Sequence, residues 1–574
     1  MSLTMMLRKG ETPWFQRVAL VVIIIIAAVL RFQHIKQPFT DYIGWRQTSC
    51  AMMAENFYRT SWNIFYPEVN WVGPGPGYQG REFQTVTYIA ALLYPILGQQ
   101  DWVGRTIAAL FGLWAIFALY QLVRRLWDTE CALAAAAVAA VAPSNTFFDR
   151  SFLPDPAMVS LVLTACWMLL AYLQSQRARY LALSAATACL GFATKLPGLV
   201  ALVPMIYAAC VIARRLPGGR LMTARLGAVA AVSLLLIAGY YLWALHLGHT
   251  YPPYHIAGGG TFIWDNGLTD LWQNRFYLPA LCWNAGWMWD GPLLLLAIAG
   301  PLLQLASDWR ERSSQTQKEH ASSEARFFFH WWLAASAVFY LLSAKEVASN
   351  CWNLYIINPA LCAFAGFTIV RGASLPAFPR RGLWRLAVGI VVISVIFVSG
   401  EYRLRDKYHP GSPLDATQSY LLGLALREAT KPGDLVVTVS NDIGSPVPIY
   451  YSRRRGWVFP PPWPEVQWWS AIPEDENDLI RWLDQLRNRG GRWLGIVEER
   501  RAEIWQRRPA FARHIEQTCA LYRKNPEWVI YKMEAQPVGN ASSSVPTCAL
   551  SMAEALARLS SFRGLNPRPD EATL

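Results

Sequence analysis

Long apolar runs separated by short charged segments dominate the first 400 residues. A helix needs roughly 20 mainly apolar residues to cross a bilayer, and about eleven of the runs approach that length. They are Val18 to Leu30, Thr106 to Val123, Cys131 to Phe148, Ala157 to Leu173, Tyr180 to Thr194, Leu196 to Ala213, Leu226 to Leu245, Gly291 to Ala306, Phe327 to Ala344, Cys351 to Val370 and Leu386 to Ser399. The pattern predicts a mainly α, polytopic transmembrane helical bundle of about eleven spans plus juxtamembrane helices.

One further apolar run, Phe83 to Leu97, is shorter and decides the topology. Lys and Arg favour the cytoplasmic side of short loops. Besides the N-terminus, the basic clusters are Arg124-Arg125, Arg177 with Arg179, Arg214-Arg215 with Arg220 and Arg225, Arg310 with Arg312 and Lys318, and Arg371 with Arg380-Arg381. All of them share one side only if Phe83 to Leu97 does not cross. We therefore predict a membrane-dipping or juxtamembrane helix there, a cytoplasmic N-terminus and a C-terminal part outside the cytoplasm.

Composition supports a membrane protein rather than a soluble one. Hydrophobic residues make up 53% of the chain, charged residues 16%, and there are 27 tryptophans, which favour membrane interfaces. The net charge of +13 is divided among clusters between apolar runs, so it indicates topology and no nucleic-acid partner. We expect a multi-pass protein of the cell inner (plasma) membrane.

The composition changes at about Glu401, where charges become frequent and spanning runs stop. Strand-like segments at Asp434 to Ser440, Trp493 to Val497 and Trp528 to Lys532, with a helix-like stretch at Glu476 to Arg489, predict an α/β unit. We therefore expect a transmembrane module over 1–400, a soluble α/β domain over 401–536 outside the cytoplasm, and a loosely ordered tail over 537–574. Cys519 and Cys548 could pair in an oxidising compartment, which their positions alone leave open.

The first loop outside the cytoplasm holds the most informative polar residues. Asp41 follows the first span and precedes a stretch with one apolar helical face, which places a carboxylate near the membrane surface. Such a carboxylate could accept a proton from an acceptor hydroxyl, while Arg46 meets the charge of a phosphate leaving group. The alternative is a solvated Asp41 paired with Arg46.

Two more acidic residues border neighbouring spans. Glu82 directly precedes the dipping run, and Asp155 begins the next span after Asp149-Arg150, where it could simply cap the helix. Asp41, Glu82 and Asp155 together could hold a divalent metal ion, with Asp41 and Glu82 as the first candidates. Their spacing does not decide between a metal site and separate roles.

Basic side chains at the outer ends of spans suit a lipid phosphate. Lys195 and Lys345 occupy such positions, although snorkelling to headgroups explains them equally well. The long loop from His246 to Asp290 adds Arg275 and many aromatic residues, suited to sugar faces or to the membrane interface.

The order of these motifs resembles that of the polytopic GT-C glycosyltransferases, in the branch of the dolichyl-phosphate-mannose-protein mannosyltransferases and the lipid A aminoarabinose transferase. The resemblance covers residues 1 to about 370 in order of motifs. The matching stretches are Asp41 after the first span, Glu82 with its downstream helix, Gly104 to Gly112 leading to Tyr120 to Arg125, Ser151 to Asp155, Thr194-Lys195, and Ser343 to Lys345 followed by Tyr355.

The resemblance implies an inverting transfer of a sugar from a polyprenyl-phosphate donor to an extracytoplasmic glycolipid, polysaccharide or protein. It implies that Asp41 is the general base and that Glu82 and Asp155 shape the catalytic cavity or a metal site. Arg105, Lys195, Lys345 and Tyr355 become candidates for binding the lipid phosphate. One departure stands out, because many relatives have a basic residue and prolines after the glutamate, whereas Phe83-Gln84-Thr85 follow here.

Two other classes of function stay open at this point. A lipid-linked sugar transporter or flippase should have ionisable residues near the bilayer midplane and often repeated halves. Here the acids cluster at span ends, and we find no internal repeat. A noncatalytic assembly subunit could bind lipid-linked sugars through the same loops.

Overall fold

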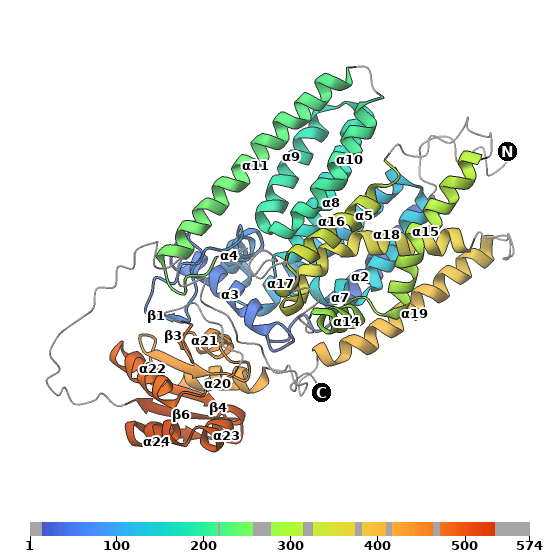
Figure 1. The fold of residues 1–574 in the computed structure, drawn as a ribbon. Helices are drawn as coiled ribbons and strands as arrows, with labels where there is room; N and C mark the ends of the chain where they lie inside the picture. Colours follow the sequence, from blue (N-terminus) through green and yellow to red (C-terminus); the bar gives the residue numbers. More distant parts are fainter. Residues whose placement is uncertain are drawn as a thin grey trace.

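The computed structural model describes residues 14–215, 218–256, 277–313, 325–373, 382–408, 416–462 and 471–533. The chain is mainly helical, with a bundle of long helices and a smaller α/β domain at one end of it (Figure 1). The mainly helical chain with a small sheet in its C-terminal region agrees with the predicted fold class, whereas the expected domain bounds stay a prediction.

Within the described residues, seven helices are long and apolar enough to cross a membrane. They are α2 (Trp14–Phe32), α5 (Asp101–Leu126), α8 (Asp155–Ser175), η1 with α10 (Leu196–Ala213), α11 (Gly219–Thr250), η2 with α18 (Cys351–Gly372) and Trp384–Arg405 of α19 (Gly382–Tyr408). The pair Leu281–Met288 and Gly291–Ser307, bent by 99°, would make an eighth. It belongs to α14 (Tyr277–Met288) and α15 (Gly291–Ser313). To reach the expected total of about eleven spans, some of the shorter apolar helices would also have to cross the membrane.

The sequence explains why some of these helices are short. The apolar run Cys131 to Phe148 is divided into α6 (Thr129–Val141) and α7 (Pro143–Phe148), because Pro143 has no N–H to continue the first helix. The helix α4 (Thr85–Leu97) has 13 residues and is therefore about 20 Å long, short of a hydrocarbon core of roughly 30 Å. This length agrees with a dipping helix, although its depth in a membrane stays a prediction.

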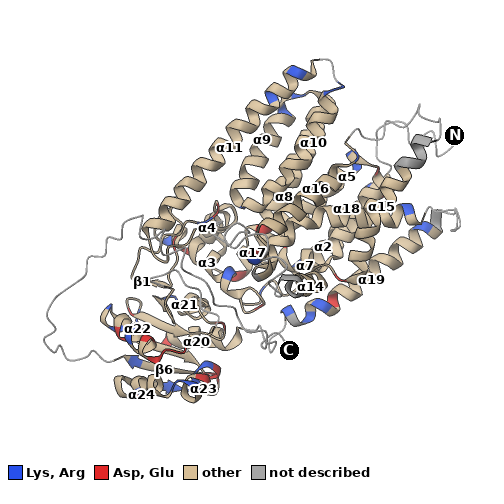
Figure 2. Ribbon diagram, viewed as in Figure 1, with Lys and Arg blue, Asp and Glu red and all other residues tan. Residues whose placement is uncertain are grey.

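The bundle has a tightly packed centre and an apolar periphery. In the centre, α5 and α6 pack against α8 and α18, and small residues allow close approach: a Cβ at Gly366 of α18 would lie 2.4 Å from the backbone nitrogen of Ala135. At the periphery, α11 and α19 expose large apolar side chains such as Leu235 and Val391. Lys and Arg residues, blue in Figure 2, lie at the ends of α10 and α11 that are far from α3 (Gly44–Arg59) and α4.

The remaining helices of the bundle are α9 (Ala178–Thr194), α16 (Phe328–Leu342) and α17 (Ala344–Ser349). The helix α19 extends past the expected domain boundary at residue 400, to Tyr408.

The α/β domain contains a six-stranded sheet with the order β1-β3-β2-β4-β6-β5. Its own strands are β2 (Leu435–Val439), β3 (Arg455–Val458), β4 (Gly491–Val497), β5 (Cys519–Lys524) and β6 (Trp528–Met533). Its helices are α20 (Thr417–Ala429), α21 (Val447–Ser452), α22 (Glu476–Asn488), α23 (Glu498–Arg507) and α24 (Pro509–Thr518). The edge strand β1 (Val72–Gly73) comes from the first loop and pairs antiparallel with β3, so one sheet joins the two halves of the chain. The tail over 537–574, with Cys548, lies outside the described residues.

Candidate active site

Asp41 lies in the turn between α2 and α3, where three side chains hold its carboxylate. Its Oδ2 is 2.9 Å from Arg105 Nη1 and 2.8 Å from Arg150 Nη2, and its Oδ1 accepts a 2.5 Å hydrogen bond from Gln47 Nε2. Burial by itself would raise the pKa of Asp41, but attraction to Arg105 and Arg150 outweighs it and holds the pKa below the ordinary 3.8. The side chain is therefore ionised at neutral pH and closed off from solvent.

Aromatic rings and a backbone hydrogen bond hold the three side chains that contact the Asp41 carboxylate. Arg105 lies over the ring of Phe39 at 4.9 Å, and Arg150 lies over the ring of Tyr408 at 4.6 Å. Gln47 also accepts a bond from the backbone N–H of Phe152. Neither Arg150 nor Gln47 was a sequence candidate, because nothing in the spacing shows that they meet Asp41.

A second cluster gathers four of the predicted residues. Glu82 pairs with Arg46, and Asp155 Oδ1 lies 2.6 Å from Lys195 Nζ. The field of Arg46 also reaches Asp155, so the two pairs adjoin. Burial by itself would raise the pKa of Glu82, but Arg46 and Arg81 outweigh it and lower the pKa. Arg46, which the sequence offered as a partner for Asp41, therefore pairs with Glu82.

This second cluster carries surplus positive charge. Arg46, Arg81 and Lys195 supply three cations against the two carboxylates of Glu82 and Asp155. Burial, with repulsion from Arg46, lowers the pKa of Arg81 to about 9. The Nη1 atom of Arg46 is buried and has no hydrogen-bond partner among the described residues. A buried donor in a cationic cluster favours an anionic ligand.

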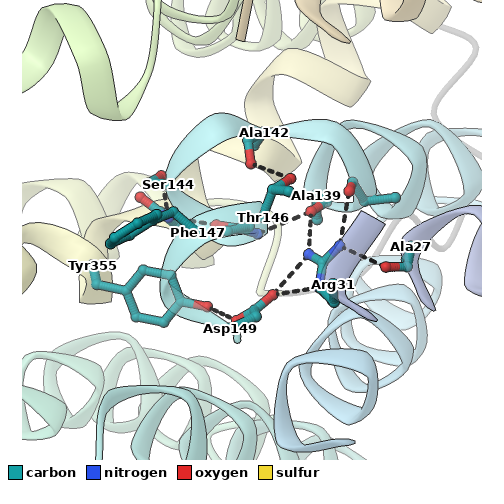
Figure 3. A network of polar contacts seen from close by, with 12 residues as sticks. Ala27, Arg31, Ala139, Ala142, Ser144, Thr146, Phe147, Asp149 and Tyr355 are labelled. Carbon is teal, nitrogen blue, oxygen red and sulfur yellow. Dashed lines mark hydrogen bonds and ion pairs between the residues drawn. The ribbon is translucent and has the colours of Figure 1, made fainter. Parts of the chain in front are cut away.

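A third network surrounds the break between α6 and α7 (Figure 3). Arg31 of α2 is fully buried and donates to Asp149 Oδ2 at 2.8 Å and to the carbonyls of Ala139 and Ala140 at 3.0 and 2.9 Å. In an unbroken helix the Ala139 carbonyl would accept from the N–H of residue 143, but Pro143 has none, so Arg31 and the side-chain amide of Asn145 supply the donors instead. Tyr355, expected at a lipid phosphate, donates its hydroxyl hydrogen to Asp149 Oδ1 instead.

Two candidates remain. Lys345 is exposed on α17, and Arg275 lies outside the described residues. Asp41 and Glu82 belong to separate ion-pair networks, and the described part of the chain brings no three His, Cys, Asp or Glu side chains together in metal-binding range. This arrangement does not fit a cation shared by Asp41 and Glu82.

An apolar groove of about 710 Å³ lies between α9 and α11, and one of its lining residues, Phe83, directly follows Glu82 of the second cluster. Its lining includes Phe83 and Ala193 near this cluster, and Ala186 and Val232 farther along the helices. Phe83 N–H donates to Ala193 O at 2.9 Å, and the hydroxyl of Tyr240, another lining residue, donates to Arg81 O at 3.0 Å. The apolar lining thus meets the charged cluster at residues 81–83.

Comparisons with known proteins give one matching family model and several similar structures. A family model described as dolichyl-phosphate-mannose-protein mannosyltransferase matches residues 85–243. The oligosaccharyltransferase of Archaeoglobus fulgidus has a similar structure, with a TM-score of 0.57 at 13% identity over 90% of this chain and 74% of that one. ArnT of Cupriavidus metallidurans has a TM-score of 0.57 at 13% identity over 91% of this chain and 99% of that one.

The chain has the GT-C glycosyltransferase fold. The mycobacterial arabinofuranosyltransferase AftD is also similar, with a TM-score of 0.50 at 14% identity over 92% of this chain and 42% of that one. No curated protein sequence matches the chain. The family-model match extends from α4 into α11, so it includes Arg105, Asp155, Lys195 and most of the groove lining but excludes Asp41 and Glu82. The family-model match and the shared fold agree with the resemblance inferred from motif order.

Proposed function

We propose that this GT-C protein is a glycosyltransferase that moves a sugar from a polyprenyl-phosphate donor to an acceptor outside the cytoplasm, with inversion. The observation that carries the proposal is an apolar groove that adjoins, at Phe83, a cationic cluster in which no described residue bonds to Arg46 Nη1. A polyprenyl phosphate has these two parts, a long apolar chain and an anionic head. The similar ArnT was solved bound to undecaprenyl phosphate, and the archaeal oligosaccharyltransferase with a dolichol-phosphate.

In this proposal the second cluster binds the phosphate. Arg46 and Arg81 provide charged N–H donors, and Lys195 adds a point charge at the start of η1 (Leu196–Ala201). As the sugar–phosphate bond breaks, negative charge builds on the departing phosphate, and fixed cations stabilise it without rearrangement. Glu82 and Asp155 hold these cations in place through their ion pairs.

Asp41 is the proposed general base. Its lowered pKa keeps it ionised, and the bond from neutral Gln47 to Oδ1 is the one that an acceptor hydroxyl can replace while both arginines stay. Asp41 takes the hydroxyl proton as the acceptor oxygen attacks the anomeric carbon on the face opposite the phosphate. Glu82 is the competing candidate, since its side chain is 10% exposed and that of Asp41 is 0% exposed.

Donor turnover by variants of both carboxylates tests the proposal. Purified protein in nanodiscs would be incubated with a panel of polyprenyl-phosphate sugars, and release of polyprenyl phosphate followed by mass spectrometry. Asp41→Asn should lower kcat by about 100-fold or more with little change in donor KM, because it removes the proton acceptor. Arg46→Gln should mainly raise donor KM. Arg371→Gln, at an exposed ion pair, is the matched control for a lost arginine.

Three outcomes would change the proposal. Wild-type protein that releases polyprenyl phosphate from none of the donors would remove the activity. Equal turnover by wild type and Asp41→Asn would remove Asp41 as the base. Loss of kcat in Glu82→Gln with full activity in Asp41→Asn would transfer that role to Glu82.

The sidedness belongs to the same proposal. With a cytoplasmic N-terminus in the inner membrane, the cluster around Asp41 and the α/β domain lie outside the cytoplasm, where the domain helps to recognise the acceptor. A membrane-impermeant thiol reagent should label a cysteine introduced near Gln99 and not one near Arg124, because α5 separates them. Labelling near Arg124 alone would overturn the topology.

A further inference from the structure

The chain segment that carries Asp41 is held by the C-terminal part of the protein. Four hydrogen bonds reach residues 37–42 from residues 407–451. They are Gln37 Nε2 to Tyr408 O at 2.8 Å, Phe39 N to Tyr451 Oη at 2.7 Å, Ala416 N to Thr40 O at 3.0 Å and Tyr42 N to Lys407 O at 3.4 Å. These bonds run along the whole turn that presents the carboxylate, so the position of Asp41 depends on elements more than 300 residues away.

Two adjacent tyrosines of α21 form the centre of this contact. Tyr450 donates to Asp101 Oδ1 at 2.8 Å, and Tyr451 donates to Asp101 Oδ2 at 2.6 Å. Burial, followed by repulsion from Asp101, raises the pKa of each tyrosine well above 10, so both hydroxyls remain donors across the physiological range. Because Tyr451 also accepts the Phe39 N–H, one hydroxyl joins α5 of the bundle to the turn before Asp41.

Asp101 connects the tyrosines to the Asp41 network. It begins α5, and Arg105 follows one helical turn later on the same face, where the two opposite charges interact. Arg105 then contacts Asp41 Oδ2 at 2.9 Å and donates to Pro38 O at 3.1 Å. A series of hydrogen bonds and charge interactions therefore leads from α21 of the C-terminal domain to Asp41.

The domain that carries α21 is itself anchored to the first loop. Arg455 of β3 lies 2.5 Å from Glu68, and Arg453 pairs with Glu55 of α3. The pairing of β1 with β3 adds a backbone connection at the same edge. These contacts leave α21 little freedom to move without the loop.

We propose that Tyr450 and Tyr451 are positioning residues through which the C-terminal domain orients Arg105 and Asp41 for turnover. This inference rests on the proposed function, in which Asp41 is the general base. It goes beyond acceptor recognition, since the domain completes the site even for a reaction whose acceptor is a small molecule.

The test uses the full-length protein with Tyr450→Phe, Tyr451→Phe and the double variant. Tyr420→Phe is the matched control, because the ring of Tyr420 packs 4.6 Å from that of Tyr451 in the same aromatic cluster. In the turnover assay, the double variant should lower kcat by about tenfold to 100-fold and leave donor KM within about twofold. Tyr420→Phe should behave like wild type.

A pH profile separates positioning from a general loss of folded protein. Loosening Arg105 weakens the attraction that lowers the pKa of Asp41, so the acid limb of kcat should move to higher pH in the double variant. A smaller folded fraction would lower kcat at every pH without moving the limb. If the acid limb of the active double variant does not move, the inference is overturned, whether its kcat is lower than that of wild type or unchanged.

Hydrogen exchange makes the structural part of the inference independent of turnover. Tyr451→Phe removes the acceptor of the Phe39 amide, so exchange in the segment 37–42 should become faster than in wild type and in Tyr420→Phe. Unchanged exchange would overturn the inference even if no donor were turned over. A wild-type protein that is inactive while exchange does change would count against the proposed function alone.

Discussion

The buried pair of Arg31 and Asp149 offers a stability prediction whose size follows from the structure. The two side chains are 0% and 1% exposed, and Arg31→Met would leave Asp149 with the Tyr355 hydroxyl as its remaining partner in the network of Figure 3. Removing one member of a buried ion pair destabilises a protein by about 3–5 kcal/mol, because the other charge stays buried without compensation. The carbonyl of Ala140 also loses its arginine donor.

The measurement is the free energy of unfolding in mixed micelles titrated with SDS. The control is Arg371→Met, whose partner Asp128 lies at a similar distance of 2.6 Å, but both side chains are exposed, at 48% and 36%. An exposed ion pair contributes about 0–1 kcal/mol, so the control should remain near wild type. Equal and small losses for the two variants would refute the reasoning from burial.

Two further measurements on the same pair sharpen the result. The double variant Arg31→Met with Asp149→Leu should lose less stability than the sum of the single variants, because neither charge is then left alone. Burial raises the pKa of Asp149, and without Arg31 the pKa should rise further. A raised pKa in the folded state contributes stability at low pH that is lost as pH rises through it, so Arg31→Met should be more destabilised at pH 8 than at pH 5.

Three other predictions follow from the site and its surroundings. The pKa of Asp41 lies below 3.8, so kcat/KM should stay level down to about pH 5, and an acid limb near pH 7 would contradict its role as base. Ala186→Trp should narrow the groove and raise KM for a full-length polyprenyl donor more than for a short-chain analogue; equal effects would separate the groove from the lipid. A Cβ at Gly112 would lie 2.3 Å from Asp149 Cγ, so Gly112→Ala should lower the free energy of unfolding by about 1–3 kcal/mol. Gly227→Ala is the control, because no atom lies within 4 Å of a Cβ there, and it should lose no stability.

The helical module and the α/β domain could be predicted from the sequence because each depends on local patterns. A helix that crosses a bilayer must satisfy its own backbone polar groups, so a long apolar run already implies its structure. The strands at Leu435–Val439, Gly491–Val497 and Trp528–Met533 likewise appear in the sequence as short runs rich in β-branched and aromatic residues. Pro143, within the apolar run Cys131 to Phe148, marks the point where that run breaks, because proline has no N–H to continue a helix.

Only the tertiary structure decided which charges meet. Asp41 pairs with Arg105 and Arg150 rather than with Arg46 five positions away, and Tyr355 bonds to Asp149 at a separation of 206 residues. Sequence spacing predicts contacts within one helix or strand, whereas the partner of a buried charge depends on how separate elements pack. The residue types around the site were therefore visible in the sequence, but their division into a sealed carboxylate and a cationic cluster at a groove arises from packing alone.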